Sequence, residues 1–213
     1  MAQRGQRGHT HQLSIPGSYH RHFRHAQPLQ QQEPLRGGWK GTPQGHICIS
    51  RTSANTISQT LLLTGASSGM GLAAAKQLSA KGANIAIVAR NKDKLTSALT
   101  EIRSAALFPD QKFEAFSADL SSPEAAAGVV AAVTAWNGAA PDTVWMMHGA
   151  SDPRLFIEAT PEALRSQMDT NYFGAANVAH AVLQQWLSPS QARLRKDRHL
   201  IFTSSTLAFF PII

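Results

Sequence analysis

Residues 64–71 read Thr-Gly-Ala-Ser-Ser-Gly-Met-Gly and carry the clearest signal for chemistry in this chain. They lie between an apolar run at residues 60–63 and a helix-like stretch at residues 72–78. In such a strand, turn and helix, glycines let the backbone approach a diphosphate, and the N–H groups that open the helix face its negative charge. The turn therefore predicts a dinucleotide site, provided that the chain supplies the surrounding βαβ unit.

Polar side chains follow the next two predicted strands. Arg90 ends the second strand, where an acidic residue suits the ribose 2′-hydroxyl of NAD and a basic residue suits the 2′-phosphate of NADP. NADP is therefore favoured, although Arg90 could also be a solvated arginine and Lys94 could assist it or lie on an exposed helix face. Asp119, with Leu120 behind it, either grips the adenine edge or begins the cap of the next helix.

The same glycine turn also fits a different enzyme class. Residues 65–69 satisfy Gly-x-Ser-x-Gly, the nucleophile elbow of α/β-hydrolases, which would make Ser67 a nucleophile. Such an elbow should follow several strands and precede an acid and then a histidine. Before residue 60 there is only the tail without predicted strands, and of the later histidines, His148, His180 and His199, the second lies within a helix and the third begins a strand. The serine-hydrolase alternative is therefore disfavoured.

From residue 60 onward, the spacing of the apolar residues alternates between that typical of strands and that typical of helices. Strands are predicted at residues 60–63, 84–89, 113–118, 142–147 and 199–203, and helices at 72–78, 92–107, 121–136 and 161–187. A β-α unit repeated four times and followed by a strand requires right-handed crossovers and a parallel sheet covered on both faces. We predict an α/β, doubly wound, Rossmann-like sheet with ligands at the carboxyl ends of its strands.

Composition divides the chain into a tail and one folded domain. Residues 1–55 are rich in Gln, His, Arg, Gly and Pro without an apolar period, which predicts a disordered basic tail before a domain at residues 56–213. Seven of the Lys and Arg residues and one Glu lie before residue 56, which gives +6 of the total charge of +7 and leaves +1 for the domain. The domain therefore has no charge pattern for a nucleic-acid partner.

The tail raises two further possibilities. Six of the nine histidines lie in it, but flexible histidines lack the geometry of a selective metal site, so we predict no metal. Its arginines also resemble an organellar transit peptide, although early glycines and Pro16 interrupt a helix. The single Cys48 is typical of a reducing compartment, and no run approaches the roughly 18 apolar residues of a membrane span.

Five features together resemble the short-chain dehydrogenase/reductase family over residues 60–213: the glycine turn, Arg90, Asp119-Leu120, Asn171 and Ser205. Within it, four stretches look like fungal 3-ketodihydrosphingosine reductases, namely residues 77–84, 135–137, 141–145 and 205–209. The resemblance implies NADPH-dependent reduction of 3-dehydrosphinganine, a small-molecule lipid ketone, to sphinganine. It also implies the cytosolic face of the endoplasmic reticulum, with peripheral membrane contact, and a homo-oligomer only if a further C-terminal part is present.

The resemblance also implies roles for individual residues. In the cofactor site it places Gly65, Ser67, Ser68, Gly69 and Gly71 in the turn, Arg90 and Lys94 at the 2′-phosphate, and Asp119 and Leu120 at the adenine. In the catalytic site, Ser205 holds the substrate carbonyl and Asn171 organises a water-mediated proton relay. Without the family, Asn171 is a polar helix residue that bonds its neighbours, and Ser205 is an ordinary strand-end hydroxyl.

Two departures from the family pattern stand out. The family places a Tyr-x-x-x-Lys pair, its proton donor and the lysine that lowers the tyrosine pKa, about a dozen residues after the serine, and neither Tyr19 nor Tyr172 has a lysine at that spacing. We therefore expect a C-terminally truncated, inactive reductase fragment or, alternatively, a non-catalytic nucleotide-binding remnant. The Asn-Ala-Gly turn of the family reads Met-His-Gly at residues 147–149, so His148 either crowds the nicotinamide ribose or replaces a small residue at a tolerant turn.

Overall fold

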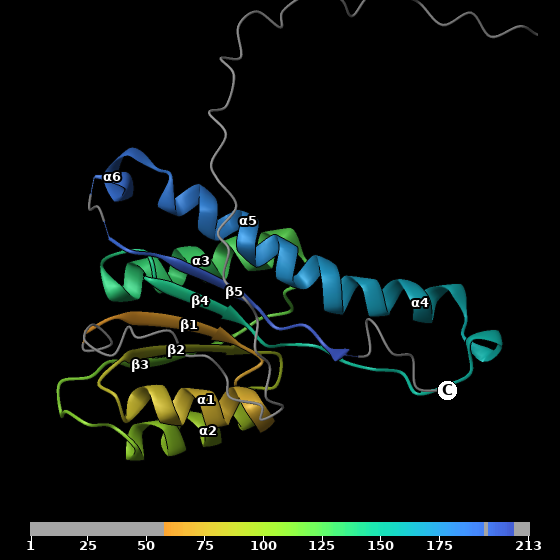
Figure 1. The fold of residues 1–213 in the computed structure, drawn as a ribbon, viewed down its shortest axis with the longest axis horizontal. Helices are drawn as coiled ribbons and strands as arrows, with labels where there is room; N and C mark the ends of the chain where they lie inside the picture. Colours follow the sequence, from red (N-terminus) through yellow and green to blue (C-terminus); the bar gives the residue numbers. More distant parts are fainter. Residues whose placement is uncertain (1–57, 194–195, 207–213) are drawn as a thin grey trace, which may run out of the picture. The chain divides into compact units, whose positions relative to one another are not determined.

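The computed structural model describes residues 58–193 and 196–206. The predicted tail at residues 1–55, its six histidines and Cys48 lie outside these described residues. A five-stranded, wholly parallel sheet forms the centre of the described part, in the strand order β3-β2-β1-β4-β5 (Figure 1). Its strands are β1 (Thr60–Thr64), β2 (Asn84–Ala89), β3 (Phe113–Ser117), β4 (Thr143–Met146) and β5 (His199–Phe202).

Helices cover both faces of this sheet (Figure 1). They are α1 (Gly69–Ser79), α2 (Lys92–Ser104), α3 (Pro123–Asn137), α4 (Pro161–Met168), α5 (Gly174–Trp186) and the short α6 (Pro189–Ala192). Alternate residues of β1 point to opposite faces, so Leu61 and Leu63 pack in the core under α1 and α2, whereas Leu62 packs under α3 and α5. The sheet is therefore buried on both sides, and the predicted doubly wound α/β fold is confirmed.

The winding direction reverses beside β1. The chain runs outward from β1 through β2 to β3, then returns to place β4 on the other side of β1. In open parallel sheets, a crevice forms at this reversal, outside the carboxyl ends of the strands. The glycine turn between β1 and α1 lies at this edge.

The structure corrects parts of the predicted element pattern. The single α-helix predicted at residues 161–187 is wrong in its middle, because a π turn (η2, Asp169–Phe173) separates α4 from α5. The segment at residues 188–198, predicted as a loop, contains α6, and a 3-10 turn (η1, Phe156–Glu158) lies between β4 and α4. Within the described residues β5 is an edge strand, and Ile201 and Phe202 are exposed there.

Candidate nucleotide-binding site

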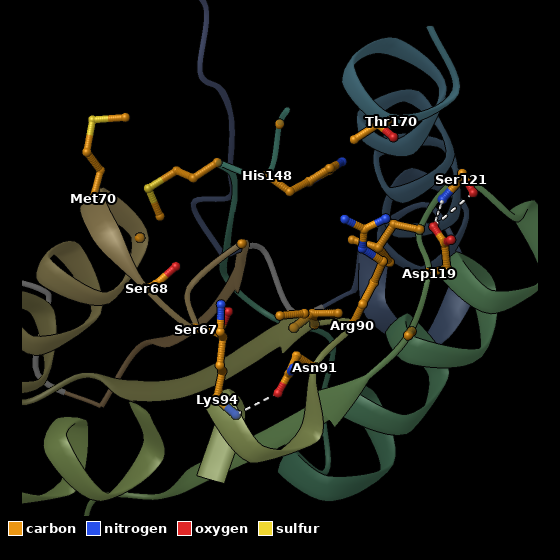
Figure 2. A pocket seen from close by; sticks show the side chains of 18 residues that line it. Ser67, Ser68, Met70, Arg90, Asn91, Lys94, Asp119, Ser121, His148 and Thr170 are labelled. Atoms are coloured by element: carbon orange, nitrogen blue, oxygen red, sulfur yellow. Dashed lines mark hydrogen bonds between the residues drawn. The ribbon is translucent and has the colours of Figure 1, made fainter. Parts of the chain in front are cut away.

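A pocket of about 400 Å³ lies at the carboxyl ends of the strands, beside the start of α1. Eight of the predicted site residues line it: Gly65, Ser67, Ser68, Gly71, Arg90, Lys94, Asp119 and Leu120. Figure 2 shows several of these side chains around the pocket, with Arg90 between Lys94 and Asp119. Residues that are up to 55 positions apart in the chain thus share one cavity, at the edge of the sheet that the topology predicts.

The glycines of the turn have distinct structural roles. Gly65 has a φ of +70°, which favours glycine, and its N–H donates to the Val88 carbonyl at 2.8 Å. A Cβ on Gly71 would lie 2.5 Å from the Gly65 carbonyl oxygen, so only glycine lets α1 start this close to the turn. Gly69 also has a positive φ, +57°, but it faces open space and does not line the pocket. The backbone is thus held close to the cavity.

The amino end of α1 differs from those of the neighbouring helices. Asn91 caps α2 and Ser122 caps α3 through side-chain hydrogen bonds, and each of these helices has an acidic residue in its first turn. At α1, the N-cap Ser68 makes no side-chain cap hydrogen bond, and the first turn has no acidic residue. The N–H groups and positive dipole end of α1 are therefore left for an external anion, as a diphosphate requires.

Two cations line the part of the pocket beside β2. The Arg90 carbonyl accepts a hydrogen bond from Ser117 Oγ at 3.0 Å, which fixes the backbone from which its side chain projects. The Lys94 N–H donates to the Asn91 cap at 2.9 Å. None of the salt bridges found among the described residues involves Arg90 or Lys94. Both exposed side chains can therefore turn toward a bound anion.

Asp119 forms a turn just before α3 but does not cap it, because the N-cap of α3 is Ser122. The Oδ1 of Asp119 accepts hydrogen bonds from the Ser121 N–H at 3.1 Å and from Ser121 Oγ at 2.8 Å. These bonds, followed by the charge of Arg90, lower the pKa of the Asp119 carboxyl. Both Asp119 and Leu120 line the pocket, although Leu120 is largely buried in the core. The turn at Asp119 and a contact with adenine are therefore compatible.

Three predicted residues do not line the pocket: Gly69, Asn171 and Ser205. Asn171 lies in the π turn, where its amide pairs with the backbone of Ala150. Its Oδ1 accepts from the Ala150 N–H and its Nδ2 donates to the Ala150 carbonyl, both at 2.8 Å. Asn171 thus anchors the loop after β4 on the helix. Ser205 lies three residues after β5 and is exposed.

His148 lies at the turn after β4, as the sequence indicates, but its contacts there were not predicted. Its Nδ1 lies 2.6 Å from Thr64 Oγ1 at the end of β1, and its ring lines the pocket. Its Nε2 is buried without a hydrogen-bond partner. A Cβ on Gly174 would lie 2.6 Å from Nε2, so the ring fills the space between β1 and the start of α5. Glycine at positions 65 and 174 leaves room for His148, but the sequence does not show that these three residues are close in space.

The stability of the fold should depend on pH through His148. Burial is the main cause that lowers the pKa of His148 below 6.5; Asp119 raises it and Arg90 lowers it. The unfolded chain therefore binds this proton more readily, so the contribution of His148 is complete above about pH 6.5 and is lost as the pH falls toward the folded-state pKa. We expect the free energy of unfolding to fall between about pH 7.5 and pH 5.5, and to fall less in His148→Asn. Equal losses in both proteins, measured by urea unfolding, would contradict this expectation.

The hydrolase alternative finds no support in the geometry. Ser67 lines the pocket, but among the described residues no hydrogen bond joins it to a histidine, because His148 faces Thr64.

Among the described residues, no group of three or more His, Cys, Asp or Glu side chains could hold a metal ion. None of the helices described is both long and apolar enough to cross a membrane.

Comparison with known proteins identifies the family. The model of the short chain dehydrogenase family matches residues 59–213. The 3-ketodihydrosphingosine reductase of Aspergillus fumigatus is 50% identical over 159 residues, which cover 72% of this chain and 43% of that protein. The 3-ketodihydrosphingosine reductase of Neurospora crassa is 47% identical over 160 residues, and the chain spans less than half the length of both of these fungal relatives.

Solved structures agree with this match. A short-chain dehydrogenase/reductase from Mycobacterium ulcerans superposes with a TM-score of 0.63 and 29% identity, covering 71% of this chain and 53% of that one. The actinorhodin polyketide ketoreductase, solved with NADPH, superposes with a TM-score of 0.64 and 25% identity, covering 73% and 56% of the two chains. The family model covers well over half of the residues, including every strand and the whole glycine turn. The chain therefore belongs to the short-chain dehydrogenase family.

Proposed function

We propose that this protein is the nucleotide-binding part of an NADPH-dependent ketone reductase. The observation that carries the proposal is the pocket in which an uncapped helix start, a close-packed glycine turn and two cations meet. Membership of the short-chain dehydrogenase family supports an oxidoreductase, and the NADPH in the polyketide ketoreductase structure supports a nicotinamide cofactor. Together, these features favour hydride transfer chemistry over hydrolysis.

The residues present fit a dinucleotide. The N–H groups at the start of α1 would hold the diphosphate, with Ser67 and Ser68 as additional donors. Asp119 and Leu120 would contact the adenine, and Arg90 and Lys94 would neutralise the 2′-phosphate that distinguishes NADP from NAD. When bound, the reduced nicotinamide supplies hydride. The residues of this chain orient the nucleotide and balance its charge.

The proposed substrate rests on the fungal relatives. Two of them, about half identical to this chain, are named 3-ketodihydrosphingosine reductases. We therefore propose that the whole protein reduces 3-dehydrosphinganine to sphinganine in sphingolipid synthesis, at the cytosolic face of the endoplasmic reticulum. Asn171 and Ser205 are the proposed relay and carbonyl-binding residues. Both roles rest on the family resemblance, since neither residue lines the pocket and the amide of Asn171 is bonded to Ala150.

Proton transfer sets a limit on what the 213 residues can do. Ketone reduction needs a proton donor as hydride arrives, and positioned acid catalysis typically contributes about 10²-fold or more in rate. Neither tyrosine, Tyr19 nor Tyr172, has a lysine four positions later. For these residues alone we propose nucleotide binding without efficient turnover, and reduction for a chain that also carries such a pair. Adding a chain segment with a Tyr-x-x-x-Lys pair should restore turnover if the reductase proposal is correct.

Replacing Arg90 with aspartate tests the proposed preference for NADPH. Loss of a charge-assisted contact and repulsion from the 2′-phosphate should weaken NADPH binding by about 30-fold, with NADH binding changed by less than about threefold. Lys92→Asp is the matched control. It also replaces a cation with an aspartate, but Lys92 lies on α2 and does not line the pocket. Isothermal titration would give both constants. Equal weakening of NADPH and NADH by Arg90→Asp would refute the 2′-phosphate role.

A further inference from the structure

The His148 side chain joins three elements at the inner wall of the pocket. It follows β4, it meets β1 through the 2.6 Å contact between Nδ1 and Thr64 Oγ1, and it packs against Gly174 at the start of α5. The Met147 N–H also donates to Thr64 Oγ1, at 3.2 Å. The position of the ring is therefore set by two strands and one helix.

These contacts select one tautomer of the neutral imidazole. Within the described part of the chain, the hydrogen bonds of Thr64 Oγ1 are those with Met147 and His148. Since Oγ1 accepts from the Met147 N–H, its own hydrogen is best satisfied by donating to Nδ1. The opposite tautomer would leave this buried hydroxyl hydrogen without a partner, whereas Nε2 lacks a partner in either tautomer. Nδ1 is therefore the acceptor, and Nε2 carries the hydrogen.

This leaves a buried donor with no acceptor beside a cavity. Among the described residues, Nε2 of His148 is the side-chain polar atom that is buried without a partner. Native structures leave few such groups, and each usually indicates a water, an ion or a ligand that completes it. The ring lines the pocket together with Gly149 and Thr170, and Figure 2 shows its nitrogen-bearing end directed toward the Thr170 side of the cavity.

We propose that the Nε2–H of His148 donates a hydrogen bond to an oxygen of the nicotinamide nucleotide bound in this pocket, making His148 an additional ligand-binding residue. This inference rests on the proposed function. The Thr64 contact holds the ring at the wall of the pocket beside Gly149 and Thr170, so an oxygen of a nucleotide bound there would be the acceptor. The bond then pairs a donor that the free protein leaves unsatisfied.

Two amide variants separate the two ring nitrogens. His148→Asn places an amide group where Nδ1 lies and removes the donor at Nε2, whereas His148→Gln places an amide nitrogen near the position of Nε2. NADPH should bind about tenfold more weakly to His148→Asn than to the unmodified 213-residue chain, and His148→Gln should stay within about threefold. Equal affinity of all three proteins, or equal losses in both variants, would overturn the inference.

The unmodified chain provides a second test that does not depend on how a variant folds. In ¹⁵N spectra of the imidazole nitrogens, assigned by the signals that His148→Asn lacks, Nε2 should be the protonated nitrogen, and its signal should shift more than that of Nδ1 when NADPH is added. A shift of neither signal at saturating NADPH would overturn the inference while leaving the proposed function intact. If the unmodified chain binds neither NADPH nor NADH, the proposed function itself fails, and the inference fails with it.

Discussion

Gly71→Ala should destabilise the fold by about 3 kcal/mol and abolish nucleotide binding. The new Cβ would lie 2.5 Å from the Gly65 carbonyl oxygen and 2.8 Å from Ala66 Cα, and both are backbone atoms. Relief requires α1 to move away from the turn, which separates the N–H groups of α1 from the site of the diphosphate. Urea unfolding would measure the loss of stability, and NADPH titration would measure the loss of binding.

Gly128→Ala is the control for this substitution. Gly128 lies within α3, is exposed, and has open space where a Cβ would project. Alanine is a better helix former than glycine by about 1 kcal/mol, so this variant should be as stable as the unmodified chain or more stable. If Gly71→Ala unfolds at the same urea concentration as Gly128→Ala, the close approach of α1 to the turn is not as described.

Gly174→Ala should also be strongly destabilising, by about 2 kcal/mol, for a different reason. Its Cβ would lie 2.6 Å from Nε2 of His148, a ring that is held on its other side by Thr64. The clash is with a side chain, so removal of that side chain should relieve it. Urea unfolding of Gly174→Ala would give the size of the loss.

The double variant with His148→Ala tests this pairing directly. In the His148→Ala background, the Gly174→Ala change should no longer cost stability and should add up to about 1 kcal/mol through helix propensity. The double-mutant cycle should therefore give a coupling energy of about 2–3 kcal/mol. Additive effects of the two substitutions would show that the imidazole does not pack against Gly174.

The order of the elements was predictable because it depends on local patterns. The apolar runs that became β1 and β2 and the glycine turn between β1 and α1 are continuous in sequence, and the right-handed crossover rule turns their alternation into a parallel sheet. The same rule brings Arg90 and Asp119 to one edge, since both follow strands of that sheet. These residues were therefore placed correctly near the cavity from sequence alone.

The middle of the long helix was not predictable in this way. The π turn at Asp169–Phe173 inserts an irregularity into a sequence with normal helix-forming residues on both sides. Asn171 bonds to Ala150, 21 positions earlier, and this long-range contact has no counterpart in the periodicity of the helix. Its anchoring of the loop after β4 appears only when the two segments are seen in space.

The contacts of His148 were likewise not predictable from the local sequence. The sequence marks it as unusual at its turn, but its partners Thr64 and Gly174 are 84 and 26 positions away. Whether the ring enters the pocket, packs in the core or does both depends on the distance between β1 and α5. That distance follows from the packing of helix on sheet, for which the sequence of either element alone has no signal.

Titration of the 213-residue chain with NADPH tests directly whether the pocket at the glycine turn binds this nucleotide. Trp136, Trp145 and Trp186 all lie in the described domain, so tryptophan fluorescence can report a titration of the unmodified protein with NADPH and, separately, with NADH. We expect a saturable response to NADPH at micromolar concentrations and binding of NADH at least about tenfold weaker. The absence of a saturable response to NADPH up to about 1 mM would contradict a nucleotide site in this pocket.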